Sequence, residues 1–417
     1  MDQYQSNGRL LALAILQCLI PSIILITTPK HSILRYLSIP CMICIVLHMM
    51  YPAQKPGYPP TNLIGSSATF VLTALDLLLI HPQAGRDFVD ANRNTKSFVS
   101  RLVQAIQLLT CSRAINTPRQ VKNVPSFPEY YTKRANGIPR GRFLVRETAI
   151  AVWQFLALDT LAVLALRQAM NDQDEESSVS SRSQSSIPGR KWTEQFIQTL
   201  IAWFVVSRIL ISFYYRVASI VFVSLGDSPS NSPPIIGRMS DMYTLRNFWG
   251  KFWHQMLRLP LTSTSNFLAR DVLRLPRSSF VERYVNVFVV FFLSGLIHVV
   301  IDSLRSVSLK ELGTMSFFLS FVVGYMIEDG VIALWKRTRG SQNDSLPAWW
   351  QRALGYCWVI TWLGVTSPWF FRSAMMKPEE QMVLVPFSVA GLIGLHVLQS
   401  IVIAGGIALK FVFEGEV

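Results

Sequence analysis

The side chains best able to do chemistry in this sequence gather in residues 244–258, which read TLRNFWGKFWHQMLR. A histidine, an asparagine and three cations stand there among aromatic residues. Imidazole can act as a general base near neutral pH, and cationic groups can bind phosphate. At helical spacing, one face of a continuous helix is predicted to carry Asn247, Lys251, His254 and Arg258, opposite a broad apolar face. Periodicity alone favours a second interpretation, an interfacial helix with aromatic residues at headgroup depth.

A histidine inside a predicted membrane span is the second candidate. His298 lies about 20 Å along its span, well inside a bilayer. Burying such a side chain in hydrocarbon is unfavourable, so it marks a functional candidate, with a structural histidine bonded to a neighbouring helix as the alternative. One turn earlier, Ser294 and Gly295 open space for another backbone, and Asp302 could orient the imidazole. Spacing does not rank His298 above His396.

The elements that must position these residues are membrane helices. Half of the 417 residues are hydrophobic and 15% are charged, which is too apolar for an ordinary soluble protein. The predicted fold is therefore all-α and polytopic, with about nine transmembrane helices and additional amphipathic interfacial helices. The apolar runs of spanning length are residues 10–28, 32–51, 63–80, 145–166, 196–225, 285–304, 314–335, 353–371 and 382–412.

Charge placement gives an orientation. Lysine and arginine concentrate in the segments after the third, fifth and seventh predicted spans, which share one side of the membrane. The positive-inside rule makes that side the cytosol, with the N-terminus lumenal and the C-terminus cytosolic. Cytosolic loops near anionic lipid account for most of the net charge of +14, with cations left for a phosphate-bearing co-substrate. No nucleic-acid partner is predicted.

The chain divides into three predicted regions: N-terminal transmembrane helices in residues 1–80, a cytosolic segment with an interfacial helix in residues 81–144, and a membrane core in residues 145–417. Within the core, residues 168–194 are expected to form a flexible lumenal loop and residues 226–284 a cytosolic segment that carries the motif. Five cysteines give no disulfide framework. No metal site is predicted.

Two histidine motifs carry a family resemblance. Residues 240–255 and 292–298 together resemble the wax synthase-like branch of the membrane-bound O-acyltransferases, and especially the fungal members that acetylate terpenoid and meroterpenoid alcohols. Scattered similarity also covers residues 113–125, Glu328 with Asp329, residues 354–358 and Pro368. Three positions depart from the family's usual pattern: Ala114 and Asn116 stand where glycines are usual, and Asn247 stands where a charged residue is usual. In the wider superfamily, many relatives have asparagine at the position that matches His254.

The resemblance implies an acyl-CoA-dependent O-acyltransferase embedded in lipid, most specifically one that transfers acetyl from acetyl-CoA to a hydroxyl of a terpenoid or related secondary metabolite. It implies His298 as the general base, with His254 or Asn247 positioning the acyl carbonyl or stabilising the oxyanion. Arg246, Lys251 and Arg258 are expected to pair with coenzyme A phosphates, although each could instead face lipid headgroups. No covalent acyl-enzyme and no permanently bound cofactor are expected, and the endoplasmic reticulum is the expected membrane.

Three other functions fit parts of the pattern. A long-chain alcohol O-fatty-acyltransferase, that is a wax synthase, shares the same motifs. A transporter would suit many spans with buried histidines, but the sequence has no two-fold repeat. A prenyltransferase would need paired acidic motifs, and residues 171–175 provide only one. The acceptor alcohol and the oligomeric state have no signature in the sequence.

Overall fold

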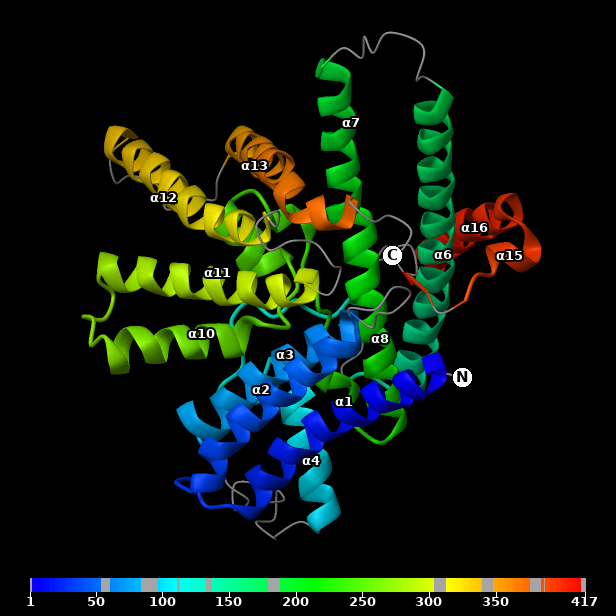
Figure 1. The fold of residues 1–417 in the computed structure, drawn as a ribbon. Coiled ribbons are helices and arrows are strands. Elements are labelled where there is room, and N and C mark those ends of the chain that lie inside the picture. The colour runs from blue at the N-terminus through cyan, green and yellow to red at the C-terminus, as the bar shows by residue number, and fades with distance from the viewer. Residues whose placement is uncertain are drawn as a thin grey trace. The chain divides into compact units, whose positions relative to one another are not determined.

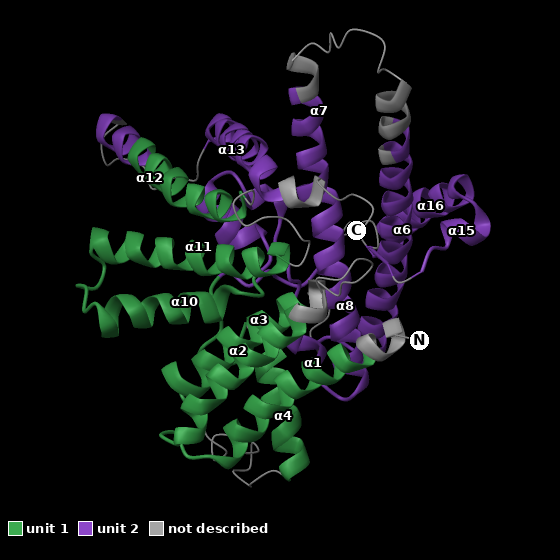
Figure 2. Cartoon of the chain, in the orientation of Figure 1, with its two compact units in different colours: residues 1–122, 255–331 green, residues 123–254, 332–417 purple. Residues whose placement is uncertain are grey.

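The computed structural model describes residues 2–53, 61–83, 97–110, 113–132, 137–178, 188–303, 313–339, 348–375, 384–385 and 387–413. These residues form helices joined by turns, with no β-strand among them, as predicted (Figure 1). They cluster into two compact units, coloured separately in Figure 2. Unit 1 comprises Met1–Lys122 and Gln255–Val331, and unit 2 comprises Asn123–His254 and Ile332–Val417.

Seven helical segments in the described part of the chain are long and apolar enough to cross a membrane. They are Gly8–Thr27, Ile33–Met50, Arg140–Gln168, Trp192–Ser224, Phe280–Ser303, Thr314–Thr338 and Leu395–Phe413. The predicted count of nine is not confirmed. The third predicted span is a shorter apolar helix, Ile64–Ile80, and the eighth is not among the seven. The ninth begins only at Leu395, because Gly394 adopts a left-handed conformation that separates two helices.

Unit 1 is built from α1 (Asp2–Thr27), α2 (Ile33–Ala53), α3 (Thr61–Leu75) and the π-helix η1 (Asp76–Ile80). Its second half contributes α10 (Arg258–Asn266), η7 (Phe267–Val272), α11 (Phe280–Ser303) and the start of α12 (Thr314–Arg339). Arg35 is fully buried, and its guanidinium donates to carbonyl oxygens of Leu25, Thr28 and Leu78. Those oxygens lie near the ends of α1 and η1, where helical carbonyls lack partners within the helix. One cation therefore joins three helices.

The predicted interfacial helix corresponds to α4 (Phe98–Thr110), which packs on α1. Ala105 and Leu109 are buried, whereas Phe98 is about half exposed.

Unit 2 contains α5 (Glu129–Thr132), α6 (Arg140–Ser178), α7 (Pro188–Ile201), the π-helix η3 (Ala202–Ser207), α8 (Arg208–Ser224), α13 (Trp349–Met375), α15 (Ala390–Ile393) and α16 (Leu395–Phe413). The helix α16 lies along α6 (Figure 1). Trp153 Nε1 donates to Val402 O over 2.8 Å. A Cβ added at Gly406 would stand 3.2 Å from the Trp153 ring, so glycine permits this contact.

The segment predicted to be a flexible lumenal loop, residues 168–194, is partly helical. The helix α6 continues to Ser178 and α7 begins at Pro188, so both ends of residues 168–194 are helical. Residues 179–187 lie outside the described part of the chain.

Candidate active site

The motif in residues 244–258 does not form the predicted continuous helix. Thr244 caps a single turn, α9 (Leu245–Asn247), by accepting a hydrogen bond from Asn247 N at 3.0 Å. The π-helix η6 (Phe248–Phe252) follows and closes with Trp253 N donating to Phe248 O. Trp253 then leaves in an extended conformation, and the next helix, α10, starts at Arg258. The wider π turn and this break change the register, so the prediction that four polar residues share one helical face was wrong.

An aromatic cluster explains this backbone path. Trp203, on the π-helix η3, contacts Trp253 with ring centroids 4.6 Å apart, and Phe248 stacks on Trp253. Phe248 and Phe252 are fully buried. Burying several large rings is worth more than the hydrogen-bond geometry of a regular α-helix in one turn, so packing selects the π-helical path.

His254 follows this cluster directly. Its Nδ1 is buried and has no hydrogen-bond partner among the described residues, although the residue as a whole is partly buried. Burial lowers the pKa of His254 from 6.5 to about 4, so the ring is neutral at physiological pH. A buried nitrogen without a hydrogen bond destabilises the fold unless a ligand supplies the missing partner. His254 is therefore a candidate for contact with substrate.

Lys251 is placed by a close backbone approach. Gly237 N donates to Phe252 O over 2.8 Å. A Cβ added at Gly237 would stand 2.1 Å from Lys251 O, closer than real atoms approach. Only glycine therefore allows residues 235–239 to run against the motif, and this contact fixes the position from which the Lys251 side chain extends.

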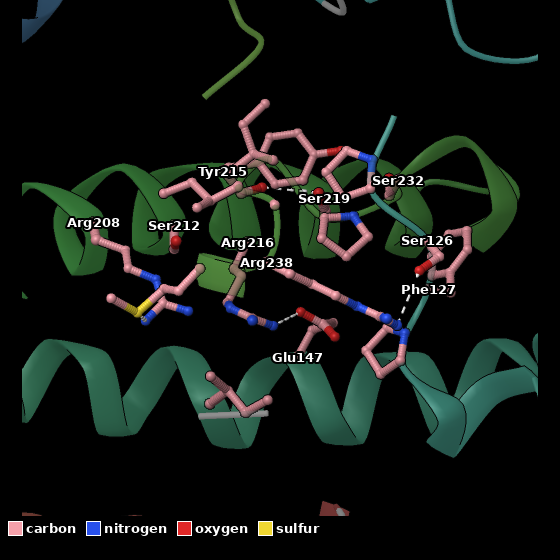
Figure 3. A pocket seen from close by; sticks show the side chains of 18 of the residues that line it. Ser126, Phe127, Glu147, Arg208, Ser212, Tyr215, Arg216, Ser219, Ser232 and Arg238 are labelled. Atoms are coloured by element: carbon pink, nitrogen blue, oxygen red, sulfur yellow. Dashed lines mark hydrogen bonds and ion pairs between the residues drawn. The ribbon is translucent and has the colours of Figure 1, made fainter. Parts of the chain in front are cut away.

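A cavity of about 990 Å³ opens within unit 2. Its walls come from α6, α8, residues 123–131 and 232–241, and Lys251 (Figure 3). The cationic side chains that line it are Arg146, Arg208, Arg216, Arg238 and Lys251. They outnumber the lining carboxylates, which are Glu129, Glu147 and Asp241. The cavity therefore presents a net positive surface to a ligand.

One carboxylate in this cavity is already neutralised. Glu147 accepts hydrogen bonds from Arg146 at 2.7 Å, from Arg216 and from Tyr131. Burial raises the pKa of the Tyr131 hydroxyl, with Arg146 acting in the opposite direction, so the phenol stays protonated and donates. Figure 3 shows Arg216 directed at Glu147, while Arg238 extends toward Ser126. The hydrogen bonds described for Arg208 and Arg238 go to Met239 Sδ and Ser126 Oγ rather than to a carboxylate.

The three cations singled out in the sequence have different surroundings. Lys251 lines the cavity. Arg246 is partly buried on α9 in the same unit and is not part of the cavity lining. Arg258 begins α10 in unit 1, where burial lowers its pKa and Tyr325 opposes that shift.

Sequence reasoning missed the cavity's arginines. One pattern in the sequence could have indicated two of them. Polar residues recur at helical spacing inside an apolar run of spanning length, at Arg208, Ser212, Tyr215, Arg216 and Ser219. A polar stripe in such a span indicates an internal, functional face.

His298 lies on α11 in unit 1, between helices rather than on an outer face. Its ring stacks on Phe318 of α12, with centroids 4.9 Å apart and an interplanar angle of 18°. Gly295 lies at the same helix contact, where an added Cβ would stand 2.9 Å from Met315 Sδ and 3.2 Å from Phe318 Cβ. One turn further along the same helix pair, Asp302 accepts a hydrogen bond from Thr314 Oγ1. His396, its rival in the sequence, is exposed on α16.

The loop that precedes unit 2 carries two of the departures from the family pattern. Residues 113–121 close on themselves, with Val121 N donating to Arg113 O over 3.1 Å. Ala114 and Asn116 have φ values of 49° and 58° within this loop. Left-handed backbone is where glycine is favoured, so the family's usual glycines have a conformational reason here.

The described residues contain no group of three or more histidine, cysteine, aspartate or glutamate side chains that could hold a metal ion.

Comparison with known proteins agrees with the fold and the motifs. The model of the "Membrane bound O-acyl transferase family" matches residues 232–320, which include both His254 and His298. The chain is 34% identical to acetyltransferase atnC of Arthrinium sp over 98% of this chain and 97% of the relative. It is 35% identical to acetyltransferase pyr8 of Aspergillus fumigatus over 94% of each, and 32% identical to acetyltransferase nanB of Aspergillus nanangensis over 97% and 98%.

The chain therefore belongs to the membrane-bound O-acyltransferase family, and it is an integral membrane acyltransferase. No solved structure matches it.

Proposed function

We propose that the protein transfers acetyl from acetyl-CoA to a hydroxyl group of a terpenoid or related secondary metabolite. The curated relatives named as acetyltransferases support the acyl group. The spanning helices support an acceptor that partitions into lipid. The distribution of lysine and arginine supports a lumenal N-terminus and a cytosolic C-terminus, and we propose the endoplasmic reticulum as the membrane.

The cationic cavity in unit 2 is the observation that carries the donor assignment. Coenzyme A bears phosphate groups at one end, and guanidinium groups bind phosphate through paired charge-assisted hydrogen bonds. Arg208, Arg238 and Lys251 line a space of about 990 Å³, close to the upper end of the range for small-molecule sites. We assign these three residues to the phosphates of the donor. Arg246 and Arg258 stay predictions for the same role.

The proposed chemistry uses His298 as a general base. His298 takes the proton from the acceptor hydroxyl as its oxygen attacks the thioester carbonyl. The C–S bond then breaks, and the departing thiolate takes up the proton from the imidazolium. His254, as the tautomer protonated at Nδ1, or the Asn247 amide donates to the carbonyl oxygen as negative charge develops. No covalent acyl-enzyme forms in this scheme.

Purified protein in detergent tests the proposal. It is incubated with a panel of acetyl-CoA and longer acyl-CoAs and with terpenoid and long-chain alcohols, and products are identified by mass spectrometry. Acetyl esters of terpenoid alcohols are the expected products. Esters formed only from long-chain acyl-CoA and long-chain alcohols would replace the proposal with a wax synthase.

The donor site is tested by kinetics. Arg238→Ala should raise KM for acetyl-CoA by about tenfold or more, because a charge-assisted hydrogen bond to phosphate is lost, while KM for the alcohol stays within twofold. Arg270→Ala is the matched control, since Arg270 lies outside the cavity and pairs with Glu282. An unchanged KM for acetyl-CoA in Arg238→Ala would remove the cavity from the donor site.

A further inference from the structure

A buried carboxylate in unit 1 gathers donors from three separate segments. Asp76 begins η1 and is 1% exposed. Arg119 Nη2 donates to both of its oxygens, at 2.8 and 2.6 Å. His81 Nδ1 lies 2.9 Å from Oδ1, and Ser263 Oγ donates to the same oxygen. Both oxygens of Asp76 therefore accept hydrogen bonds, from Arg119 at each and from Ser263 at Oδ1.

The arrangement resembles a serine, histidine and aspartate set in composition but not in geometry. A catalytic set of that kind needs serine on one imidazole nitrogen and aspartate on the other. Here His81 Nδ1 faces both Asp76 at 2.9 Å and Ser263 at 3.0 Å. His81 therefore cannot pass a proton from Ser263 toward Asp76, and the cluster is suited to holding segments together.

The segments that Asp76 joins are those next to the motif. Arg119 belongs to the closed loop 113–121, and Ser263 lies on α10. A second hydrogen bond joins the same parts of the chain: Gln255 Nε2 donates to the carbonyl oxygen of Lys122, at the end of that loop, over 3.5 Å. Gln255 follows His254 directly in the sequence, and Arg258 begins α10. The path of the chain just after His254 is thus fixed against loop 113–121 at two points.

We propose that Asp76 is a positioning residue for acyl transfer: through Ser263 and Arg119 it sets the backbone that follows His254. The inference rests on the proposed role of His254. Asp76 touches neither donor nor acceptor in this scheme. It acts on the chemical step, since displacing a catalytic group by about 1 Å can cost as much as 100-fold in rate. The cavity assigned to the donor phosphates belongs to the other unit, so contacts of the donor with Arg208, Arg238 and Lys251 do not depend on Asp76.

The test compares two serines of one helix. Ser263 and Ser265 are both buried on α10, but Ser265 Oγ donates only to Thr262 O of its own helix in the hydrogen bond described for it. Ser263→Ala should lower kcat about tenfold and leave KM for acetyl-CoA within twofold. Ser265→Ala should leave kcat within twofold. Asp76→Asn should lower kcat at least as far as Ser263→Ala.

Hydrogen exchange gives a readout that does not need turnover. Ser263→Ala should speed exchange of amides in loop 113–121 about tenfold or more, and Ser265→Ala should not. If wild type turns over no acceptor in the panel, the proposed function fails, and exchange still decides whether Asp76 ties the loop to α10. Equal effects of the two serine variants, in either measurement, would overturn the positioning role.

Discussion

Trp203 Nε1 donates a hydrogen bond of 2.7 Å to Ser367 Oγ, and both residues are almost completely buried. The contact joins η3 to α13 and holds the tryptophan whose ring packs against Trp253, next to His254. Trp203 and Ser367, which have no proposed role in the reaction, therefore fix the packing around Trp253 beside the candidate active-site residue His254.

Ser367→Ala should destabilise the protein by about 1 to 3 kcal/mol, because the buried Nε1–H of Trp203 loses this acceptor. The thermal midpoint in detergent measures the loss. Ser320→Ala is the control, since Ser320 Oγ donates only within its own helix in the bond described for it. If the two variants lose the same stability, the Trp203 contact has no special weight.

Gly237→Ala should abolish activity or folding. Its added Cβ would meet Lys251 O at 2.1 Å, and a backbone atom cannot move away as a flexible side chain can. Gly250→Ala lies in the same motif with open space around the added carbon, and it should keep most activity. Size-exclusion profiles and acetyl transfer distinguish loss of fold from loss of function. Wild-type behaviour of Gly237→Ala would show that residues 235–239 do not hold Lys251.

His298→Ala should reduce acetyl transfer by about 100-fold or more, the contribution expected of a general base, with normal expression and membrane insertion. Microsomes supplied with acetyl-CoA and the acceptor give the rate. His396→Ala, at the exposed histidine, should retain activity. Normal turnover by His298→Ala would remove it from the reaction.

His254 should make stability depend on pH in one direction. Its folded pKa of about 4 lies below the unfolded value of 6.5, so between these values the unfolded chain binds more protons. The folding stability that depends on a neutral His254 is fully present above pH 6.5 and is lost as the pH falls toward 4. His254→Gln should therefore lose less thermal stability than wild type between pH 7 and pH 5, and His396→Gln should behave as wild type. A pH response of His254→Gln identical to wild type would contradict the assignment.

Ala114→Gly should stabilise the protein by about 1 kcal/mol, because an L side chain with positive φ is strained. Asn116→Gly should gain less, since asparagine tolerates this conformation better. Thermal midpoints compare the two variants. A loss of stability in Ala114→Gly would mean that the methyl group makes contacts worth more than the strain.

Local patterns were enough to predict the all-α fold, most spanning helices and the helical setting of His298. The break after Trp253 was not predictable from spacing, because it depends on packing against Trp203, about fifty residues earlier in the chain. Periodicity reports on one helix at a time. A ring supplied by a distant helix can therefore override it.

The cationic cavity of unit 2 shows the same limit. Lys251 was predicted from its place in the motif. Arg208 and Arg238 can be recognised as candidate binding residues only in the folded structure, where α8 and residues 232–241 line the same cavity. The polar stripe on α8 was visible in the sequence, but its partner Glu147 lies on another helix.

That partnership has a consequence for biogenesis. A lone arginine in a nascent helix opposes its release from the insertion machinery into hydrocarbon, by about 2.5 to 3.5 kcal/mol at the centre. Arg216 of α8 gains its carboxylate partner, Glu147 of α6, only after the two helices meet, whereas Glu147 already has Arg146 beside it on α6. These two segments should accordingly enter the bilayer as a pair, with α6 retained beside the translocon until α8 has been synthesised.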